Sequence, residues 1–215
     1  DWMHEIPPMT NTISGMTIDV HHNLVPLVSR MQLNGDEILR KSRANEHGIV
    51  TLSSEDKVLH SAIHLLLDSE FNHGFRDLHD IYLLLEEFLA ADELFLENLF
   101  QRSKHLGCES ILFYCLKLQQ HFFGLNVEED LLNKCQPKKA SLYLRRYVLI
   151  LFQKVLTPDI EKHKSKSYQY ALLFLFIRSH WLKMPLHLLI PHLFHKSFIT
   201  PFEQRKIRKA KEENT

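Results

Sequence analysis

The stretch that decides the fold runs from Ser53 to Asp68 and reads SSEDKVLHSAIHLLLD. Ser53 or Ser54 predicts the start of a helix, because serine caps helices and acidic residues follow in the first turn. Apolar residues fall on one side of a helical wheel, and polar residues, including His60 and His64, fall on the other. The spacing therefore predicts an amphipathic helix with both histidines on its polar face. Its predicted core residues are Val58, Leu59, Ala62, Ile63 and Leu66.

The rest of the chain continues this helical pattern. A second helix is predicted over 75–89, with Arg76, Asp80 and Glu87 facing away from the core. The low content of glycine (6) and proline (8) also favours helices over a turn-rich β fold. We predict a mainly α protein, a multi-helix array. Further predicted helices span 92–105, 109–123, 127–134, 138–156, 167–182 and 186–197.

The N-terminal region differs in composition and predicts one β-strand at about 16–22. Alternation along this strand puts Met16, Ile18 and Val20 on one face, and Asp19 and His21 on the other. A lone strand leaves its edges unpaired, which indicates a small β element left over from a larger sheet. The predicted domains are a remnant lobe (1–52), a helical domain (53–200) and a charged C-terminal helix or tail (201–215).

The formal net charge of zero hides an uneven distribution. Residues 1–135 carry 10 Lys/Arg and 21 Asp/Glu, and residues 136–215 carry 16 and 5, so the two parts have charges of −11 and +11. The basic part could meet an anionic partner such as RNA, a nucleotide or anionic lipid, or the two parts could dock on each other.

Cysteine content and hydropathy indicate which cellular compartment to expect. The three cysteines, Cys108, Cys115 and Cys135, show no CxxC spacing, which is typical of a reducing compartment. The apolar run at 170–177 is too short for a membrane span, so no transmembrane helix is predicted. We therefore expect a cytoplasmic protein. The aromatic residues of the C-terminal half, Phe174, Phe176, Trp181, Phe194 and Phe198, recur at helical spacing and are predicted to be core.

Two groups of residues have the types and spacing that carry chemistry. Asp19 and His21 share one face of the predicted strand, as a metal ligand or general base would. His60 and His64 lie one turn apart on one helix, and Arg76 and Asp80 one turn apart on the next. An exposed ion pair and a polar helix face explain the second group equally well.

One arrangement of these residues resembles the HD-type metal-dependent phosphohydrolases. His60 would be a first ligand and His79-Asp80 the adjacent His-Asp pair. The fourth ligand would be Asp92, Asp130 or Asp159. Imidazoles and carboxylates suit a divalent ion that activates water. The residues after the pair, Ile81-Tyr82-Leu83, are bulkier than is usual in that family.

The order of two segments resembles another family, the uncharacterised nucleotidyltransferases of the DNA polymerase β-like superfamily. The first is HEIPPM followed by GMTIDVHHNL at 15–24, and the second is VLHSAIH at 58–64 followed by HGFRDLHDIYLL at 73–84. The likeness covers about residues 4–90. It implies that Asp19 is the third catalytic carboxylate and a Mg²⁺ ligand, and that His21 is its catalytic neighbour. It also implies that His64, Arg76 and Asp80 contact substrate.

That resemblance implies transfer of a nucleotidyl group from a nucleoside triphosphate to an acceptor that the sequence leaves open. The family's Gly-Ser turn and Asp-x-Asp pair are absent from these 215 residues. Two-metal transfer needs paired carboxylates, so we expect the C-terminal part of an enzyme, inactive as the isolated chain. A non-catalytic helical interaction module is the remaining alternative.

Overall fold

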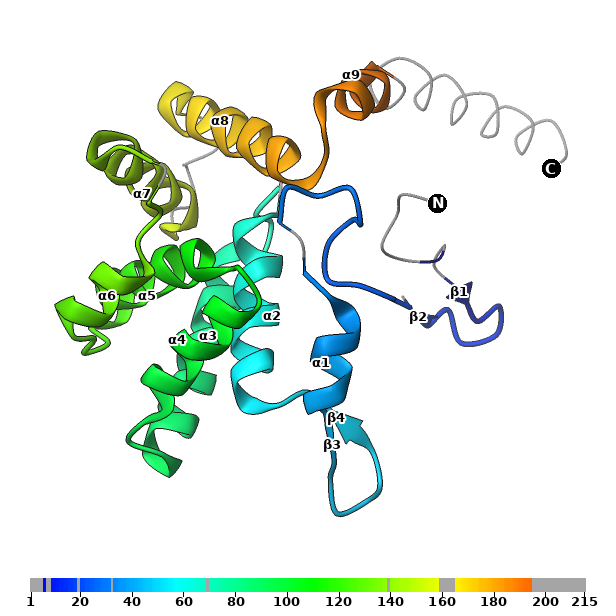
Figure 1. Ribbon diagram of the computed structural model, residues 1–215. Coiled ribbons are helices and arrows are strands. Elements are labelled where there is room, and N and C mark those ends of the chain that lie inside the picture. The colour runs from blue at the N-terminus through cyan, green and yellow to red at the C-terminus, as the bar shows by residue number, and fades with distance from the viewer. Residues whose placement is uncertain are drawn as a thin grey trace, which may run out of the picture.

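The computed structural model describes residues 6, 9–18, 20–31, 33–68, 70–138, 140–158 and 165–194. Helices dominate this part of the chain, as the sequence predicts (Figure 1). The helices are α1 (Gly35–Lys41), α2 (Ser54–Leu66), α3 (Gly74–Ala91), α4 (Phe95–His105), α5 (Glu109–Phe123), α6 (Glu129–Cys135), α7 (Leu142–Leu156), α8 (Lys166–Lys183) and α9 (Leu186–Phe194). The strands are β1 (Met9–Thr10), β2 (Thr17–Ile18), β3 (Arg43–Ala44) and β4 (Val50–Thr51).

Helix α2 lies at the centre of the helical array and packs against α3, α4 and α5. It begins as predicted, because the Ser53 hydroxyl accepts a hydrogen bond from the Asp56 backbone N–H at 3.2 Å. The five apolar residues predicted for its core face are all buried. Because the apolar face of α2 is buried, the opposite, polar face points toward the surface.

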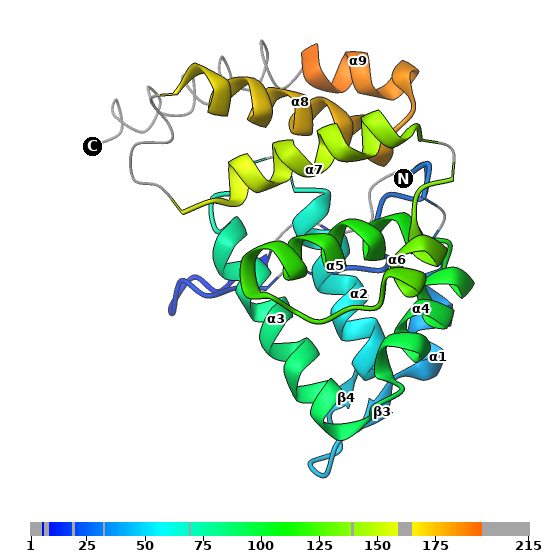
Figure 2. The ribbon, with the colours of Figure 1, turned by 90° about the vertical axis from the view of Figure 1, so that its left-hand side faces the viewer.

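Helices α7 and α8 run side by side in a layer above α5 (Figure 2). The first residue of α3 approaches this layer closely. A Cβ on Gly74 would lie 2.6 Å from Cδ2 of Leu156, at the end of α7. A larger residue at the start of α3 would have to displace this leucine methyl group, so Gly74 lets α3 begin close to the end of α7.

The predicted strand at 16–22 is seen in part, and residue 19 within it lies outside the described residues. Its ladder covers Thr17–Ile18, which pairs antiparallel with Met9–Thr10, so the strand's partner comes from within the chain. Met16, Ile18 and Val20 are 68%, 59% and 41% exposed, and no core forms on that face. Pairing is also present after residue 19, where the Ile6 backbone N–H donates to the Val20 carbonyl oxygen at 3.0 Å.

The region between the first hairpin and α2 contains two elements that the sequence patterns did not indicate. Helix α1 spans only seven residues, capped by the Asn34 side chain, and buries one side chain, Ile38. Strands β3 and β4 form a second antiparallel hairpin. Val25, Leu33 and Ile38 belong to the same buried cluster as the helices. The division at residue 52 stays a prediction.

The aromatic residues of α8 do not all lie in the core, and this part of the sequence interpretation was wrong. Phe174 is 49% exposed and Trp181 is 42% exposed, while Phe176 is half-buried. The side chains of Phe194 and Phe198 lie outside the described part of the chain. The sequence of α8 has apolar residues on every side of the helix. Helical spacing therefore could not show which side faces the core. No helix in the described ranges combines the length and apolarity that a membrane crossing needs.

All three cysteines are buried and carry free thiols. Burial raises the pKa of each thiol, Cys108, Cys115 and Cys135, to about 12. Reactive cysteines need a thiolate at neutral pH. These residues are therefore structural.

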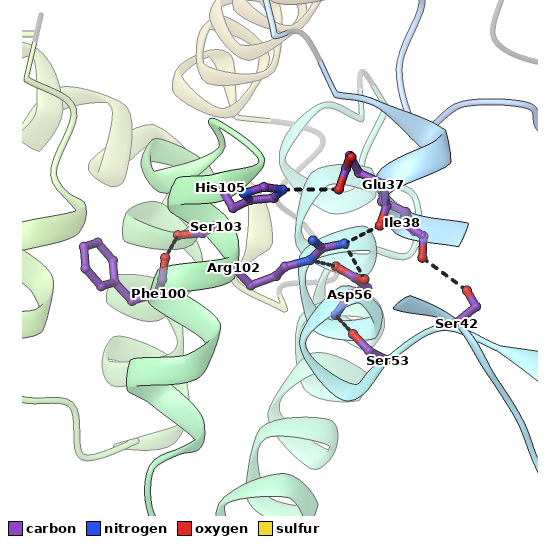
Figure 3. A network of polar contacts seen from close by, with 9 residues as sticks. All are labelled: Glu37, Ile38, Ser42, Ser53, Asp56, Phe100, Arg102, Ser103 and His105. Atoms are coloured by element: carbon purple, nitrogen blue, oxygen red, sulfur yellow. Dashed lines mark hydrogen bonds and ion pairs between the residues drawn. The ribbon is translucent and has the colours of Figure 1, made fainter. Parts of the chain in front are cut away.

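A buried ion pair joins α4 to the start of α2 (Figure 3). The Arg102 guanidinium donates from Nε to Asp56 Oδ1 at 2.7 Å and from Nη2 to Asp56 Oδ2 at 2.8 Å. Nη2 also donates to the Glu37 carbonyl oxygen of α1 at 3.0 Å. The Arg102 and Asp56 side chains are only 3% and 1% exposed. One arginine thus ties three helices together.

Replacing Asp56 by Asn should leave the Arg102 charge buried without its counter-ion. We expect the free energy of unfolding to fall by about 3–5 kcal/mol, measured by urea denaturation. The same change in the exposed Asp130, which pairs with Lys134 at 3.4 Å, is the control and should cost less than about 1 kcal/mol. Equal losses in the two variants would show that the buried pair has no special role.

Candidate functional site

A pocket of about 430 Å³ opens where three separate segments meet. Residues 21–26 form one wall, the C-terminal half of α2 forms the floor, and the last residue of α8 closes the pocket. Its polar residues come from all three segments. The lining consists of His21, Leu24, Val25, Pro26, His60, Ile63, His64, Leu67, Asp68 and Lys183.

The polar face of α2 supplies most of the chemistry in this pocket. His60 and His64 lie one turn apart on one face of α2. Asp68 follows just beyond the end of the helix, and its carboxylate accepts hydrogen bonds from the Glu70 and Phe71 backbone N–H groups at 3.2 and 2.9 Å. The ring centroids of His60 and His64 are 6.3 Å apart. Both imidazoles are exposed to the pocket because the opposite face of α2 is buried.

Residues 20–31 are fastened to the end of α8, and this brings His21 and Lys183 to the same pocket. The Ser29 hydroxyl donates to the Leu182 carbonyl oxygen at 2.9 Å, and the Arg30 backbone N–H donates to the same oxygen at 3.0 Å. Arg30 Nε donates to the Trp181 carbonyl oxygen at 2.9 Å, and its guanidinium lies 3.9 Å from the Trp181 ring centroid.

The same segment is also fixed against α1. The Asn23 side-chain amide donates to the Leu33 carbonyl oxygen at 3.0 Å, which closes the loop on itself. A Cβ on Gly35 would lie 2.9 Å from the His22 carbonyl oxygen, so only glycine lets the first turn of α1 approach the loop this closely. The loop that carries His21 is therefore held in place by contacts with both α8 and α1.

Helix α8 also satisfies the C-terminal end of α2. An Arg178 guanidinium N–H donates to the Leu66 carbonyl oxygen at 3.2 Å, and the Ser179 hydroxyl donates to the Leu67 carbonyl oxygen. The last carbonyls of a helix have no partner within it. These bonds hold α8 over the end of α2, next to the pocket.

The surroundings of His60 favour the neutral form of its imidazole over the protonated form. The His60 ring keeps a surface toward the pocket, but the protein atoms around it exclude much of its water. This desolvation lowers the pKa of His60 below the ordinary value of 6.5, and the neighbouring His64 and His21 lower it further. A neutral imidazole presents one N–H donor and one acceptor nitrogen. With Lys183 and Asp68, the pocket offers groups of both charge signs around this imidazole.

The structure brings together some of the residues that the sequence singled out. His21 and His64, 43 positions apart in the sequence, line the same pocket. Arg76 and Asp80 are not in its lining. Arg76 pairs with the adjacent Asp77, with Nη2 and Oδ1 2.9 Å apart, and Asp80 is exposed one turn further along α3. Asp19 lies outside the described residues.

The ligands expected for a phosphohydrolase centre lie apart. His60 lines the pocket, whereas the His79 ring packs on Phe123 at 5.6 Å between centroids. Asp92 accepts hydrogen bonds at the start of α4, and Asp130 pairs with Lys134. Asp159 lies outside the described residues. In the part of the chain that the structure describes, no three His, Cys, Asp or Glu side chains are grouped as a metal site would require.

Asp68 and Lys183 are the pocket residues to which the sequence interpretation gave no function. Asp68 was detectable, because it continues the polar face one turn beyond His64. Lys183 was not, since its position depends on the docking of α8 on a loop about 150 residues earlier, for which no sequence pattern exists.

The fold and pocket define a helical module with a histidine-lined pocket at one end of its central helix. The chain belongs to the family of uncharacterised nucleotidyltransferases, whose sequence model matches residues 4–124. This confirms the resemblance and extends it beyond residue 90 to the end of α5. His21, His60, His64 and Asp68 lie within the matched residues, and Lys183 lies outside them. No curated protein and no solved structure matches the chain.

The pKa of His60 predicts how stability responds to pH. The folded state holds this pKa below the 6.5 of an unperturbed imidazole, so between the two values the unfolded chain binds more protons. The free energy of unfolding should therefore fall as pH drops below 6.5 and level off beneath the folded pKa. An NMR titration of the His60 ring protons measures this directly. A midpoint at or above 6.5 would contradict it, and His60→Gln should reduce the slope of stability against pH.

Proposed function

We propose that the chain takes part in transfer of a nucleotidyl group from a nucleoside triphosphate to an acceptor, with release of pyrophosphate. Membership of the nucleotidyltransferase family supports the class of reaction. The observation that carries the proposal is the convergence of His21 and His64 in one pocket. The family resemblance picks out both residues from separate segments, and a substrate site needs them together.

In this proposal the pocket holds the acceptor or the nucleotide beside the reacting groups. Lys183 attracts the anionic part of the substrate, and the neutral His60 offers a hydrogen-bond acceptor to a hydroxyl group. His21 acts at the reacting atoms, and His64 contacts substrate. Arg76 and Asp80, which lie outside the pocket lining, contact a part of the acceptor that extends beyond it.

The family also implies Mg²⁺, with Asp19 as one of its ligands. Magnesium prefers oxygen ligands. Among the described residues of the pocket lining only Asp68 has a carboxylate, and its two oxygens already accept hydrogen bonds from the Glu70 and Phe71 backbone N–H groups. The described residues of the pocket therefore do not fit a magnesium site by themselves. Our proposal assigns the metal to Asp19 together with an Asp-x-Asp pair that this sequence lacks, and gives residues 1–52 as the end of the catalytic lobe, 53–200 as a helical domain and 201–215 as a tail. The buried free thiols support the cytoplasmic location expected from the sequence.

The test uses the chain as it is encoded, including any residues before Asp1, with Mg²⁺ and each nucleoside triphosphate. Pyrophosphate release is the readout. Asp19→Asn should abolish turnover, because a third carboxylate holds the metal that the reaction needs. Asp130→Asn, an exposed change of the same kind, should leave turnover intact. Absence of both nucleotide binding and product from the unaltered chain would overturn the proposal.

A second candidate function is binding of an anionic partner through the outer face of α7 and α8. Residues 136–158 and 165–194 contain no Asp/Glu, and Arg146, Lys154 and Lys166 are exposed on these two helices. Apolar and aromatic side chains are exposed on the same helices. Tyr147 and Phe174 pack edge to face at 5.5 Å between centroids while both remain about half-exposed. Cationic and apolar groups on one face are typical of a surface that meets anionic lipid.

Vesicles containing anionic lipid should therefore bind the chain, and binding should weaken as salt rises. Arg146→Gln with Lys154→Gln should weaken it, whereas Asp19→Asn should not. Sedimentation with vesicles measures the bound fraction. Equal binding to neutral vesicles, or no dependence on salt, would argue against this second function.

A further inference from the structure

A second cavity, of about 590 Å³, lies at the other end of α2 from the histidine pocket. It is enclosed by the end of α1, the β3–β4 hairpin, the first turn of α2 and the junction between α3 and α4 (Figure 1). Neither the family resemblance nor the proposed reaction uses it. Its lining consists of Arg40, Lys41, Ser42, Arg43, Thr51, Leu52, Ser53, Ser54, Glu55, Lys57, Phe88, Ala91, Asp92 and Phe95.

Four cationic side chains line this cavity: Arg40, Lys41, Arg43 and Lys57. Residues 1–135 contain only 10 Lys/Arg against 21 Asp/Glu, so the cavity gathers four of those ten cations in the acidic part of the chain. Arg40 pairs with Glu37 at 2.9 Å. Among the residues that the structure describes, no carboxylate forms an ion pair with Lys41, Arg43 or Lys57.

The two acidic residues of the lining do not balance these charges. Asp92 accepts hydrogen bonds from the Leu94 backbone N–H at 2.9 Å and from the Asn98 side chain at 3.1 Å, so its carboxylate is used at the start of α4. Glu55 lies in the first turn of α2. With Arg40 offset by Glu37, the three remaining cations, Lys41, Arg43 and Lys57, outnumber the two carboxylates of the lining, so the cavity keeps a net positive charge.

Hydroxyl groups add neutral hydrogen-bonding groups to the same cavity. Ser42 donates to the Ile38 carbonyl oxygen at 3.3 Å, and Ser53 caps α2. Thr51 and Ser54 line the cavity beside them. Phe88 and Phe95, whose ring centroids are 5.2 Å apart, provide an apolar wall. The cavity thus combines cations, hydroxyl groups and an aromatic surface.

We propose that this cavity binds a ligand that carries several phosphate groups. Arginine and lysine are the side chains that recognise phosphate oxygens, and separate cations along one cavity suit more than one phosphate. The volume lies within the roughly 300–1,000 Å³ of small-molecule sites. The site is separate from the histidine pocket, so the inference does not depend on the proposed reaction.

The test measures binding of tripolyphosphate and of ATP to the 215-residue chain by isothermal titration calorimetry, without Mg²⁺. Replacing Arg43 and Lys57 together by Gln should weaken the binding of both probes about 10-fold or more, because two charge-assisted contacts are lost. The control is Lys104→Gln with Lys134→Gln, two exposed cations that make the same charge change away from the cavity. It should leave the dissociation constants within about twofold.

Further arms identify the source of the phosphate and separate this site from the other. ATP binding that exceeds tripolyphosphate binding supports a nucleotide, and a short RNA that binds more tightly than either supports a phosphate backbone. A loss in the Arg43 and Lys57 variant, set against the unchanged control, assigns the binding to this cavity and not to the histidine pocket. Unaltered circular dichroism checks the fold of each variant, and the single changes Arg43→Gln and Lys57→Gln replace the double variant if it unfolds. No binding of any probe, or an equal loss in the control, would overturn the proposal.

Discussion

The buried pair of Arg102 and Asp56 is the interaction on which the arrangement of α1, α2 and α4 depends. It fixes α4 against the first turn of α2, and through the Glu37 carbonyl it also holds α1. Helix α1 has seven residues and one buried side chain, so it has little stability of its own. Buried ion pairs demand accurate geometry, since each lost contact leaves a charge in a low dielectric. The pair therefore specifies the position of α1 more than it adds to total stability.

Both cavities depend on that position. The end of α1 forms one side of the cationic cavity, and its first turn packs on the loop that leads to His21. The two cavities lie at opposite ends of α2, a helix of 13 residues and so roughly 20 Å long. One rigid element thus sets the distance between a histidine site and a cationic site. A ligand that occupied both would need to span about that length.

The sequence predicted what depends on local spacing and capping. Ser53 marked the start of α2, and the burial of Val58 and Ile63 followed from their face. The bounds of α5 agree with the predicted 109–123 because Gly124, with a positive φ of 69°, ends that helix. Helix α1 was missed because seven residues are too few to show a period.

What the sequence could not predict depends on contacts between distant segments. The family resemblance singled out His21 and His64, but it could not show that they share a pocket with Lys183, which α8 supplies. It also named Arg76, whose charge is engaged by Asp77 on α3. The exposure of Phe174 and Trp181 depends on which side of α8 the rest of the molecule covers.

The hydrogen bond and the cation–π contact between Arg30 and Trp181 have a further consequence for the order in which the chain folds. Arg30 and Trp181 are 151 residues apart in the sequence. A contact between residues so far apart has a high loop-closure entropy, and it can form only after both residues have been synthesised. During synthesis the ribosome must therefore release α8 before Lys183 can reach His21, so the nascent chain carries α2 and its histidines without a complete pocket while the helices from α3 to α8 are being made.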